Sequence, residues 1–181
     1  FGFFADPGLS DTIWVHAVSV GEMNAAAPLI EALMKRFEGR RIVVSTVTPT
    51  GSARAQKLFG ERVFHVYLPY DLTASIRRFL DRINPSLAVV METEIWPNLY
   101  YECARRGVPI VLANARLSER SLNGYGPVRP LARQAIHSVA LVAAQSQQDA
   151  LRLAQLGARP TRLRVVGNVK FDMRVPGGLE R

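Results

Sequence analysis

The chain has 181 residues, 48% of them apolar, with a formal net charge of +8 and a pI near 10.4. This length suits one hydrophobic core, and its apolar runs are too short for the roughly 20 residues that cross a membrane as a helix. The charge predicts an anionic partner, such as nucleic acid, a phosphorylated substrate or acidic lipid headgroups, and does not choose among them.

Along the chain, short apolar runs alternate with stretches of helical periodicity. Strands are expected at residues 13–18, 42–46, 63–67, 87–91, 110–114, 141–144 and 163–166. Helices are expected at residues 25–37, 49–59, 73–83, 98–106, 127–138 and 147–156. Near-continuous apolar strands are typical of parallel sheets covered on both faces. The pattern predicts an α/β fold, a Rossmann-like doubly wound parallel sheet with right-handed crossovers.

Acidic residues follow two of these predicted strands. Glu22 comes after the first strand, and Glu92 and Glu94 come after the fourth. In a doubly wound sheet, ligands bind beyond the carboxyl ends of the strands, where the strand order reverses. If the first four strands have the common order 3-2-1-4, the first and fourth are neighbours. Both acidic motifs then face one crevice.

The first of these loops allows two interpretations. Gly21 offers a place where the backbone can turn sharply or let a ligand approach. Glu22 lies near a helix start, where the helix dipole lowers a carboxyl pKa, whereas burial or the charges of Glu92 and Glu94 would raise it toward the range of a general base. Alternatively, Glu22 only stabilises the helix N-terminus. Glu92 and Glu94 point the same way if their strand continues through them.

For other polar and aromatic residues, a structural role has to be weighed against a functional one. Asn114 and Arg116, at the end of the fifth strand, could contact phosphate or carboxylate oxygens, and loop capping explains them nearly as well. Trp96 is expected to pack over the end of the sheet. The single cysteine, Cys103, excludes an internal disulfide, favours a reducing compartment and is expected to serve packing. The three histidines lie far apart, so no metal site is expected.

Several common nucleotide and hydrolase signatures are absent from the sequence. The first loop contains Gly21 without a Gly-x-Gly-x-x-Gly pattern, and no P-loop or Gly-x-Ser-x-Gly motif occurs. A dinucleotide oxidoreductase, a P-loop enzyme and an α/β-hydrolase are therefore disfavoured.

Six segments together resemble the 3-deoxy-D-manno-octulosonic acid (Kdo) transferases, in order and over nearly the whole chain. They are residues 16–22, 46–51, 66–71, 91–98, 114–118 and 167–172. The resemblance implies the amino-terminal lobe of a two-domain glycosyltransferase of the GT-B type. Residues 1–174 would form the acceptor-side domain and residues 175–181 would begin an interdomain linker. The donor-binding carboxy-terminal domain and a membrane anchor would lie outside this chain, and this lobe alone should be nearly inactive.

The resemblance also implies a reaction. Such enzymes transfer Kdo from CMP-Kdo to a lipid A precursor at the cytoplasmic face of the Gram-negative inner membrane, in lipopolysaccharide biosynthesis. By position, Glu22 is the expected general base for direct displacement with inversion, with no metal ion or cofactor. The expected substrate-binding residues are Ser19, Gly21, Glu92, Glu94, Asn114, Arg116 and Lys170. Whether Glu92 or Glu94 is essential stays open.

The expected partners are the lipid A precursor, CMP-Kdo and the anionic membrane surface, and not nucleic acid. The segment 73–83, with its arginines and Phe79, is a candidate for contact with the membrane. Two alternatives stay open: a nucleotide-sugar epimerase with the same two-lobed fold, and a basic membrane-binding module without catalysis.

Overall fold

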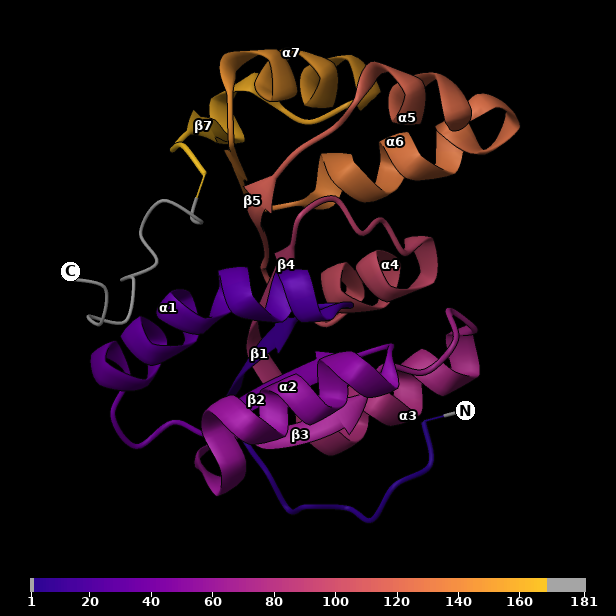
Figure 1. The fold of residues 1–181 in the computed structure, drawn as a ribbon. Coiled ribbons are helices and arrows are strands. Elements are labelled where there is room, and N and C mark those ends of the chain that lie inside the picture. The colour runs from indigo at the N-terminus through magenta and orange to yellow at the C-terminus, as the bar shows by residue number, and fades with distance from the viewer. Residues whose placement is uncertain (1, 169–181) are drawn as a thin grey trace, which may run out of the picture.

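A seven-stranded parallel sheet organises the chain, and helices cover both of its faces (Figure 1). The computed structural model describes residues 2–168. The strands are β1 (Thr12–His16), β2 (Ile42–Thr46), β3 (Phe64–Tyr67), β4 (Pro85–Met91), β5 (Ile110–Ala115), β6 (Leu141–Ala144) and β7 (Leu163–Val165). The α-helices are α1 (Val20–Arg36), α2 (Pro49–Phe59), α3 (Thr73–Ile83), α4 (Pro97–Arg105), α5 (Glu119–Gly124), α6 (Arg129–Ser138) and α7 (Gln147–Leu156). Short 3-10 turns are η1 (Gly60–Arg62), η2 (Gly126–Val128) and η3 (Pro160–Arg162).

The strand order is β3-β2-β1-β4-β5-β6-β7, and every neighbouring pair is parallel. The first four strands therefore have the 3-2-1-4 order that the sequence analysis assumed. The order reverses between β1 and β4, which pair through Ile13 with Leu87 and through His16 with Val90. The carboxyl ends of these two strands lie side by side, so the loops that follow them share one edge of the sheet.

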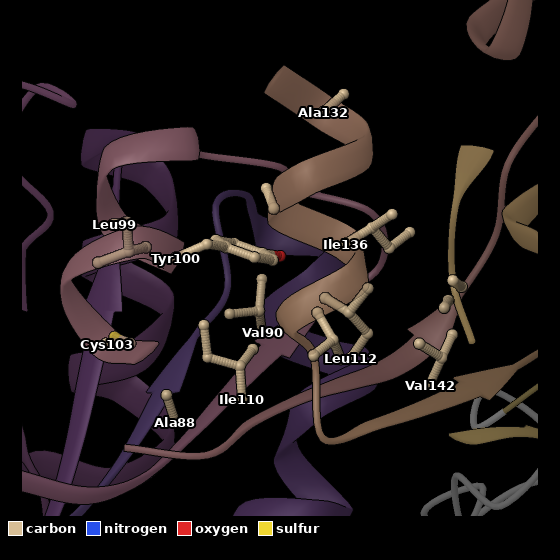
Figure 2. Close-up of a cluster of buried hydrophobic side chains, with 14 of the residues drawn as sticks. Ala88, Val90, Leu99, Tyr100, Cys103, Ile110, Leu112, Ala132, Ile136 and Val142 are labelled. Atoms are coloured by element: carbon tan, nitrogen blue, oxygen red, sulfur yellow. The ribbon is translucent and has the colours of Figure 1, made fainter. Parts of the chain in front are cut away.

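The apolar side chains form one layer on each face of the sheet. On one face α1 and α2 pack against β1 and β2, with Met23, Ile30 and Phe59 in the layer. On the other face the larger layer involves α3, α4, α6 and α7. Figure 2 shows part of it, where Tyr100 of α4 and Ile136 of α6 pack over β4, β5 and β6. These two layers hold the sheet edge, and the loops on it, in a fixed position.

Most element boundaries agree with the sequence prediction, and two differ. Thr48 caps α2 by accepting a hydrogen bond from the Gly51 N–H at 3.1 Å, as its position before a proline predicts. The first helix begins at Val20, five residues earlier than expected, because Ser19 is its N-cap. The short helix α5 was not predicted, although Ser118 caps it in the same manner.

Cys103 lies in the larger apolar layer, and its side chain is fully buried. Burial raises the pKa of its thiol to about 12, so the thiolate is scarce at neutral pH. The prediction that Cys103 serves packing is confirmed.

The membrane contact expected of α3 cannot include Phe79. Phe79 is fully buried against Trp14, with ring centroids 5.2 Å apart, because it belongs to the face of α3 that packs on the sheet. The arginines of α3 are also engaged: Arg77 pairs with Glu102 of α4, and Arg82 donates to the Gly2 carbonyl oxygen. Within residues 2–168, no helix has the length and apolar character needed to cross a membrane.

Candidate functional site

Glu22 lies in the first turn of α1, at the carboxyl end of β1. One carboxylate oxygen accepts a hydrogen bond from the Val18 N–H at 2.9 Å, and the other accepts from the Ser19 hydroxyl at 3.0 Å. Ser19 also caps the helix by accepting from the Glu22 N–H at 3.4 Å. Only 8% of Glu22 is exposed. The carboxylate is therefore buried, oriented and hydrogen-bonded at the point where the strand order reverses.

The pKa of Glu22 is raised above its ordinary value. Burial is the largest cause, because it disfavours the charged form. The hydrogen bonds from Val18 and Ser19 act in the opposite direction, and the charges of Glu92 and Glu94 raise the pKa further. Because β1 and β4 are neighbours, the acidic loops that follow them lie at the same edge of the sheet, as expected from the assumed strand order. A carboxylate in this environment can act as a base.

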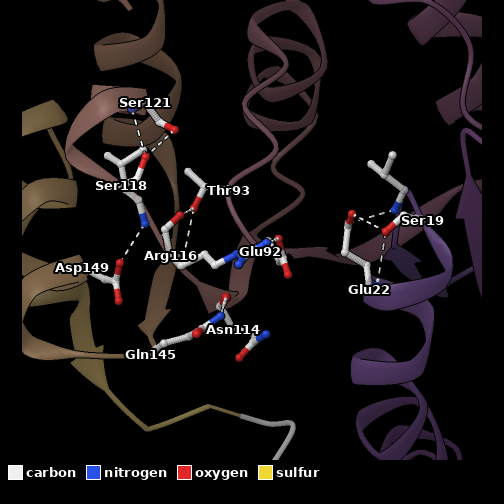
Figure 3. A network of polar contacts seen from close by, with 12 residues as sticks. Ser19, Glu22, Glu92, Thr93, Asn114, Arg116, Ser118, Ser121, Gln145 and Asp149 are labelled. Atoms are coloured by element: carbon white, nitrogen blue, oxygen red, sulfur yellow. Dashed lines mark hydrogen bonds and ion pairs between the residues drawn. The ribbon is translucent and has the colours of Figure 1, made fainter. Parts of the chain in front are cut away.

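The loop after β4 turns sharply, so the expectation of a continuing strand is not met. Glu92 has a φ of 55°, in the left-handed region, and β4 ends at Met91. One oxygen of Glu92 accepts from Nε and Nη2 of Arg116, at 3.0 and 2.8 Å. Thr93 and the backbone of Arg116 are also joined by hydrogen bonds. Figure 3 shows this pairing between the ends of β4 and β5.

Glu94 and Trp96 occupy the next turn of the same loop. The pKa of Glu94 is raised, mainly by burial. The Trp96 side chain acts to lower this pKa, and the charge of Glu92 raises it further. Trp96 packs against the larger apolar layer, with its ring 6.3 Å from that of His16. The prediction that Trp96 packs over the sheet end is therefore confirmed. The Glu94 carbonyl oxygen accepts from the Tyr100 hydroxyl at 2.7 Å, which fixes the loop on α4.

His16 ends β1, directly beneath this loop, and is fully buried. Burial lowers its pKa to about 4, so the ring is neutral at physiological pH. Its Nδ1 lies 2.8 Å from the Ser45 hydroxyl, which also accepts from the Trp14 indole. His16 is thus part of the support below the acidic loops.

Asn114 and Arg116 stand at the end of β5 and differ in exposure. Asn114 is 1% exposed, has a φ of 55°, and its carbonyl oxygen accepts from the Gln145 side chain at 3.0 Å. The Arg116 side chain is 58% exposed and reaches Glu92. Non-glycine residues with positive φ therefore occur at the ends of both β4 and β5, which is typical of sites where the backbone is held for function.

A cavity of about 630 Å³ opens beside these residues. Its lining comes from the loops after β4, β5 and β6 and from α5 and α7. Of its lining residues, only Glu92, Glu94 and Arg116 were expected site residues, and those that sequence reasoning missed include Tyr125, Gln145, Asp149 and Arg152. No spacing in the sequence relates them to Glu92 or Arg116, because they meet only when consecutive loops gather at one edge of the sheet.

Gly21 and Lys170 complete the expected set. Gly21 lies within α1 with ordinary helical geometry, so the expected sharp turn is absent. A side chain there would meet only the Ser19 hydroxyl, at 3.9 Å, so space for a ligand remains beside it. Lys170 falls outside the described residues. Among residues 2–168, no group of three or more histidine, cysteine, aspartate or glutamate side chains could hold a metal ion.

Solved structures share this fold at low sequence identity. A UDP-GlcNAc 2-epimerase from Neisseria meningitidis matches with a TM-score of 0.63 and 14% identity, over 89% of this chain and 48% of that one. Another UDP-N-acetylglucosamine 2-epimerase matches with a TM-score of 0.62 and 12% identity, over 88% and 47%. These likenesses confirm the predicted fold class, one lobe of the two-lobed GT-B type.

Sequence comparison identifies the family. The family model for 3-deoxy-D-manno-octulosonic-acid transferase matches residues 1–173. The chain is 41% identical to the Kdo transferase of Haemophilus influenzae, over 100% of this chain and 43% of that protein. It is 39% identical to that of Bordetella pertussis, over 97% and 41%. The chain thus spans less than half the length of these relatives. It belongs to the 3-deoxy-D-manno-octulosonic acid transferase family.

Proposed function

We propose that this chain is the acceptor-side lobe of an enzyme that transfers Kdo from CMP-Kdo to a lipid A precursor, with Glu22 as the general base. The observation that supports the proposal most directly is the environment of the Glu22 carboxylate. Its carboxylate is buried, has a raised pKa, and lies where the strand order reverses, beside the acidic loop after β4. The donor would be bound mainly by a second lobe, which corresponds to the part of the relatives outside this chain.

In the proposed reaction, Glu22 removes the proton from an acceptor hydroxyl. The acceptor oxygen forms a bond to the anomeric carbon of Kdo, and the bond from that carbon to the CMP phosphate oxygen breaks, so CMP leaves with the electron pair. Attack opposite the leaving group inverts the anomeric configuration. The hydrogen bonds from Val18 and Ser19 fix the direction in which Glu22 presents its oxygens. They also oppose the rise in its pKa, because they stabilise the charged form.

The two alternative functions have weaker support. The epimerases share the fold at 14% and 12% identity, a likeness that concerns the fold alone. The relatives at 41% and 39% identity are Kdo transferases. A binding module without catalysis would leave Glu22, Glu92 and Glu94 with structural roles alone, in capping α1 and in pairing with Arg116.

A membrane-surface location at the cytoplasmic face of the inner membrane is part of the proposal. The net charge of +8 suits an anionic surface. Between α4 and α6, a groove is lined by Tyr101 and Leu131, which are 56% and 54% exposed. With Arg129 and Arg133 on α6, these side chains replace α3 as the candidate membrane contact. Sedimentation with anionic and neutral vesicles tests this location, and equal binding to both would contradict it.

Transfer by the full-length enzyme tests the role of Glu22. Wild type and Glu22→Gln are compared with CMP-Kdo and a tetraacylated lipid A precursor. Loss of the base should lower kcat by about 10² to 10⁴-fold while circular dichroism stays unchanged. Full activity in a folded Glu22→Gln variant would remove Glu22 from this role, and absence of transfer by wild type would reopen the epimerase and binding-module alternatives.

A further inference from the structure

The cavity beside Glu92 and Glu94 is lined by Glu94 and Tyr125 at one end and by Arg152 of α7 at the other. We propose that it is the subsite for the acceptor sugar, in which Arg152 binds a phosphate of the acceptor and Tyr125 together with Glu94 binds a sugar hydroxyl. This inference rests on the proposed function and adds which residues select the acceptor.

The size and origin of the cavity suit a sugar phosphate. Its volume of about 630 Å³ lies within the range of small-molecule sites in proteins. Successive loops from β4, β5 and β6 build it, so its lining residues follow the order of the strands along the sheet edge. Glu22 follows β1, Glu94 follows β4, and Arg152 lies on α7 after β6. The end of the cavity at Glu94 is thus nearest to Glu22, and Arg152 is farthest from it.

Several charged side chains that line the cavity already have hydrogen-bond or ion-pair partners within the protein. Asp149 accepts from the Leu117 N–H at 2.9 Å with one oxygen and from the Ser146 hydroxyl with the other. Glu92 forms an ion pair with Arg116. Asp149 and the Glu92–Arg116 pair thus have structural roles in the cavity wall. The side chains that remain available for a ligand are Arg152, Glu94 and Tyr125.

Arg152 has few interaction partners within the protein. It makes one hydrogen bond, from Nη1 to the Leu117 carbonyl oxygen at 3.4 Å. Within residues 2–168 no carboxylate pairs with it at 4.0 Å or less. A guanidinium group has five N–H donors in a planar fork that matches phosphate oxygens. Its side chain is half-buried in the cavity wall, so a phosphate there would meet it with reduced competition from water.

Tyr125 and Glu94 meet at the other end of the cavity without bonding to each other. The hydroxyl of Tyr125 has no hydrogen-bond partner within the described part of the chain, while the Glu94 charge is close enough to raise the Tyr125 pKa after burial. A sugar hydroxyl can donate to the Glu94 carboxylate and accept from the Tyr125 phenol. One ligand hydroxyl can therefore bond to both groups.

The test compares two acceptors with the full-length enzyme, a phosphorylated lipid A precursor and the same lipid after removal of its phosphates. Arg152→Gln should raise KM for the phosphorylated acceptor by about 10- to 100-fold, as expected for loss of a charge-assisted hydrogen bond. KM for the dephosphorylated acceptor, KM for CMP-Kdo and kcat should stay within about twofold. Arg120→Gln is the matched control, because Arg120 lies exposed on α5 and carries the same charge.

Tyr125→Phe tests the other end of the cavity. It should raise KM about 5- to 10-fold for both acceptors equally, since the phenol does not contact the phosphate. Equal effects of Arg152→Gln on the two acceptors, or an equal effect of Arg120→Gln, would overturn the phosphate assignment. No effect of Tyr125→Phe would overturn the hydroxyl assignment.

Calorimetric binding of the two acceptors without donor separates this inference from the proposed function. Tighter binding of the phosphorylated acceptor that Arg152→Gln abolishes would support the subsite even if wild type transferred no Kdo. Affinity that does not depend on Arg152 would overturn it, whatever the activity.

Discussion

Ser19 and Glu22 are joined by two hydrogen bonds of opposite direction. The Ser19 hydroxyl accepts from the Glu22 N–H at 3.4 Å and donates to the Glu22 carboxylate at 3.0 Å. The same serine therefore caps α1 and orients the proposed base. Helix capping and general-base catalysis are not competing explanations of Glu22, because one arrangement supports both.

Ser19→Ala separates these two effects. Loss of the cap should lower the free energy of unfolding by about 1 kcal/mol. Loss of the hydrogen bond to the carboxylate should raise the pKa of Glu22 and move the acid limb of the pH–rate profile of the full-length enzyme to higher pH. Ser146→Ala is the matched control, because Ser146 caps α7 through Asp149 in the same way. It should lower stability similarly without moving the acid limb, and an equal shift in both variants would contradict the account.

Glu92→Gln should lower the pKa of Glu22. The charge of Glu92 raises that pKa, and its removal also frees the Arg116 guanidinium, which favours a nearby carboxylate. The acid limb should therefore move to lower pH, opposite to the shift in Ser19→Ala. A pH–rate profile of the full-length variant measures this, and an unchanged or upward shift would show that the two acidic loops are not coupled.

Glu102→Gln should destabilise the fold, because Glu102 of α4 pairs with Arg77 of α3 and with Arg105 of its own helix. The buried Glu102 carboxylate accepts from Arg77 at 2.9 Å and Arg105 at 3.0 Å. Burial acts to raise its pKa, but the two arginines outweigh burial and lower it. A lowered folded-state pKa contributes stability that is present above the unfolded pKa and is lost as pH falls through the folded pKa.

Chemical unfolding near pH 7 should thus show a loss of about 2 kcal/mol in Glu102→Gln, which shrinks as the pH falls below the ordinary glutamate pKa. Glu31→Gln removes an exposed pair with Arg62 and should change stability by less than about 0.5 kcal/mol. A loss in Glu102→Gln that is independent of pH would contradict this assignment.

Replacing Gly51 of α2 with alanine should disturb the neighbouring loop that orients Glu22. A side chain at Gly51 would lie 2.9 Å from the Thr48 hydroxyl and 3.0 Å from the Val18 carbonyl oxygen, so Val18 would have to move. The Val18 N–H donates a hydrogen bond to the Glu22 carboxylate. A loss of about 1 to 2 kcal/mol and a lower kcat are expected. Gly124→Ala, on α5 with open space around it, should leave stability unchanged or raise it slightly.

The sheet could be predicted because its strands are strongly apolar and regularly spaced. Strand positions agreed within two residues, and the order assumed for the first four strands is the observed one. The start of α1 was placed too late because Gly21 suggests a turn, although Ser19 and Glu22 have the spacing of a capping box. The helix α5 was missed because it has six residues with one buried side chain, Leu122, too few to show periodicity.

The acidic side of the candidate site could be inferred from strand ends and topology, and the cavity could not. Glu22, Glu92 and Glu94 each follow a recognisable strand, so the strand order alone brings them together. Tyr125 and Arg152 belong to helices and turns that follow later strands. Their approach to Glu94 depends on how α5 and α7 pack, which no local pattern encodes. The inward burial of Phe79 likewise depends on which face of α3 meets the sheet.

The most direct test of the central claim is the pH dependence of kcat for the full-length enzyme, measured for wild type and for the residual activity of Glu22→Gln. The raised pKa of Glu22 predicts that wild-type kcat falls on acidification with an apparent pKa above the ordinary glutamate value of 4.5, because the base must be deprotonated. In Glu22→Gln this acid limb should be absent from the residual rate. The same acid limb in both proteins would show that another group is the base.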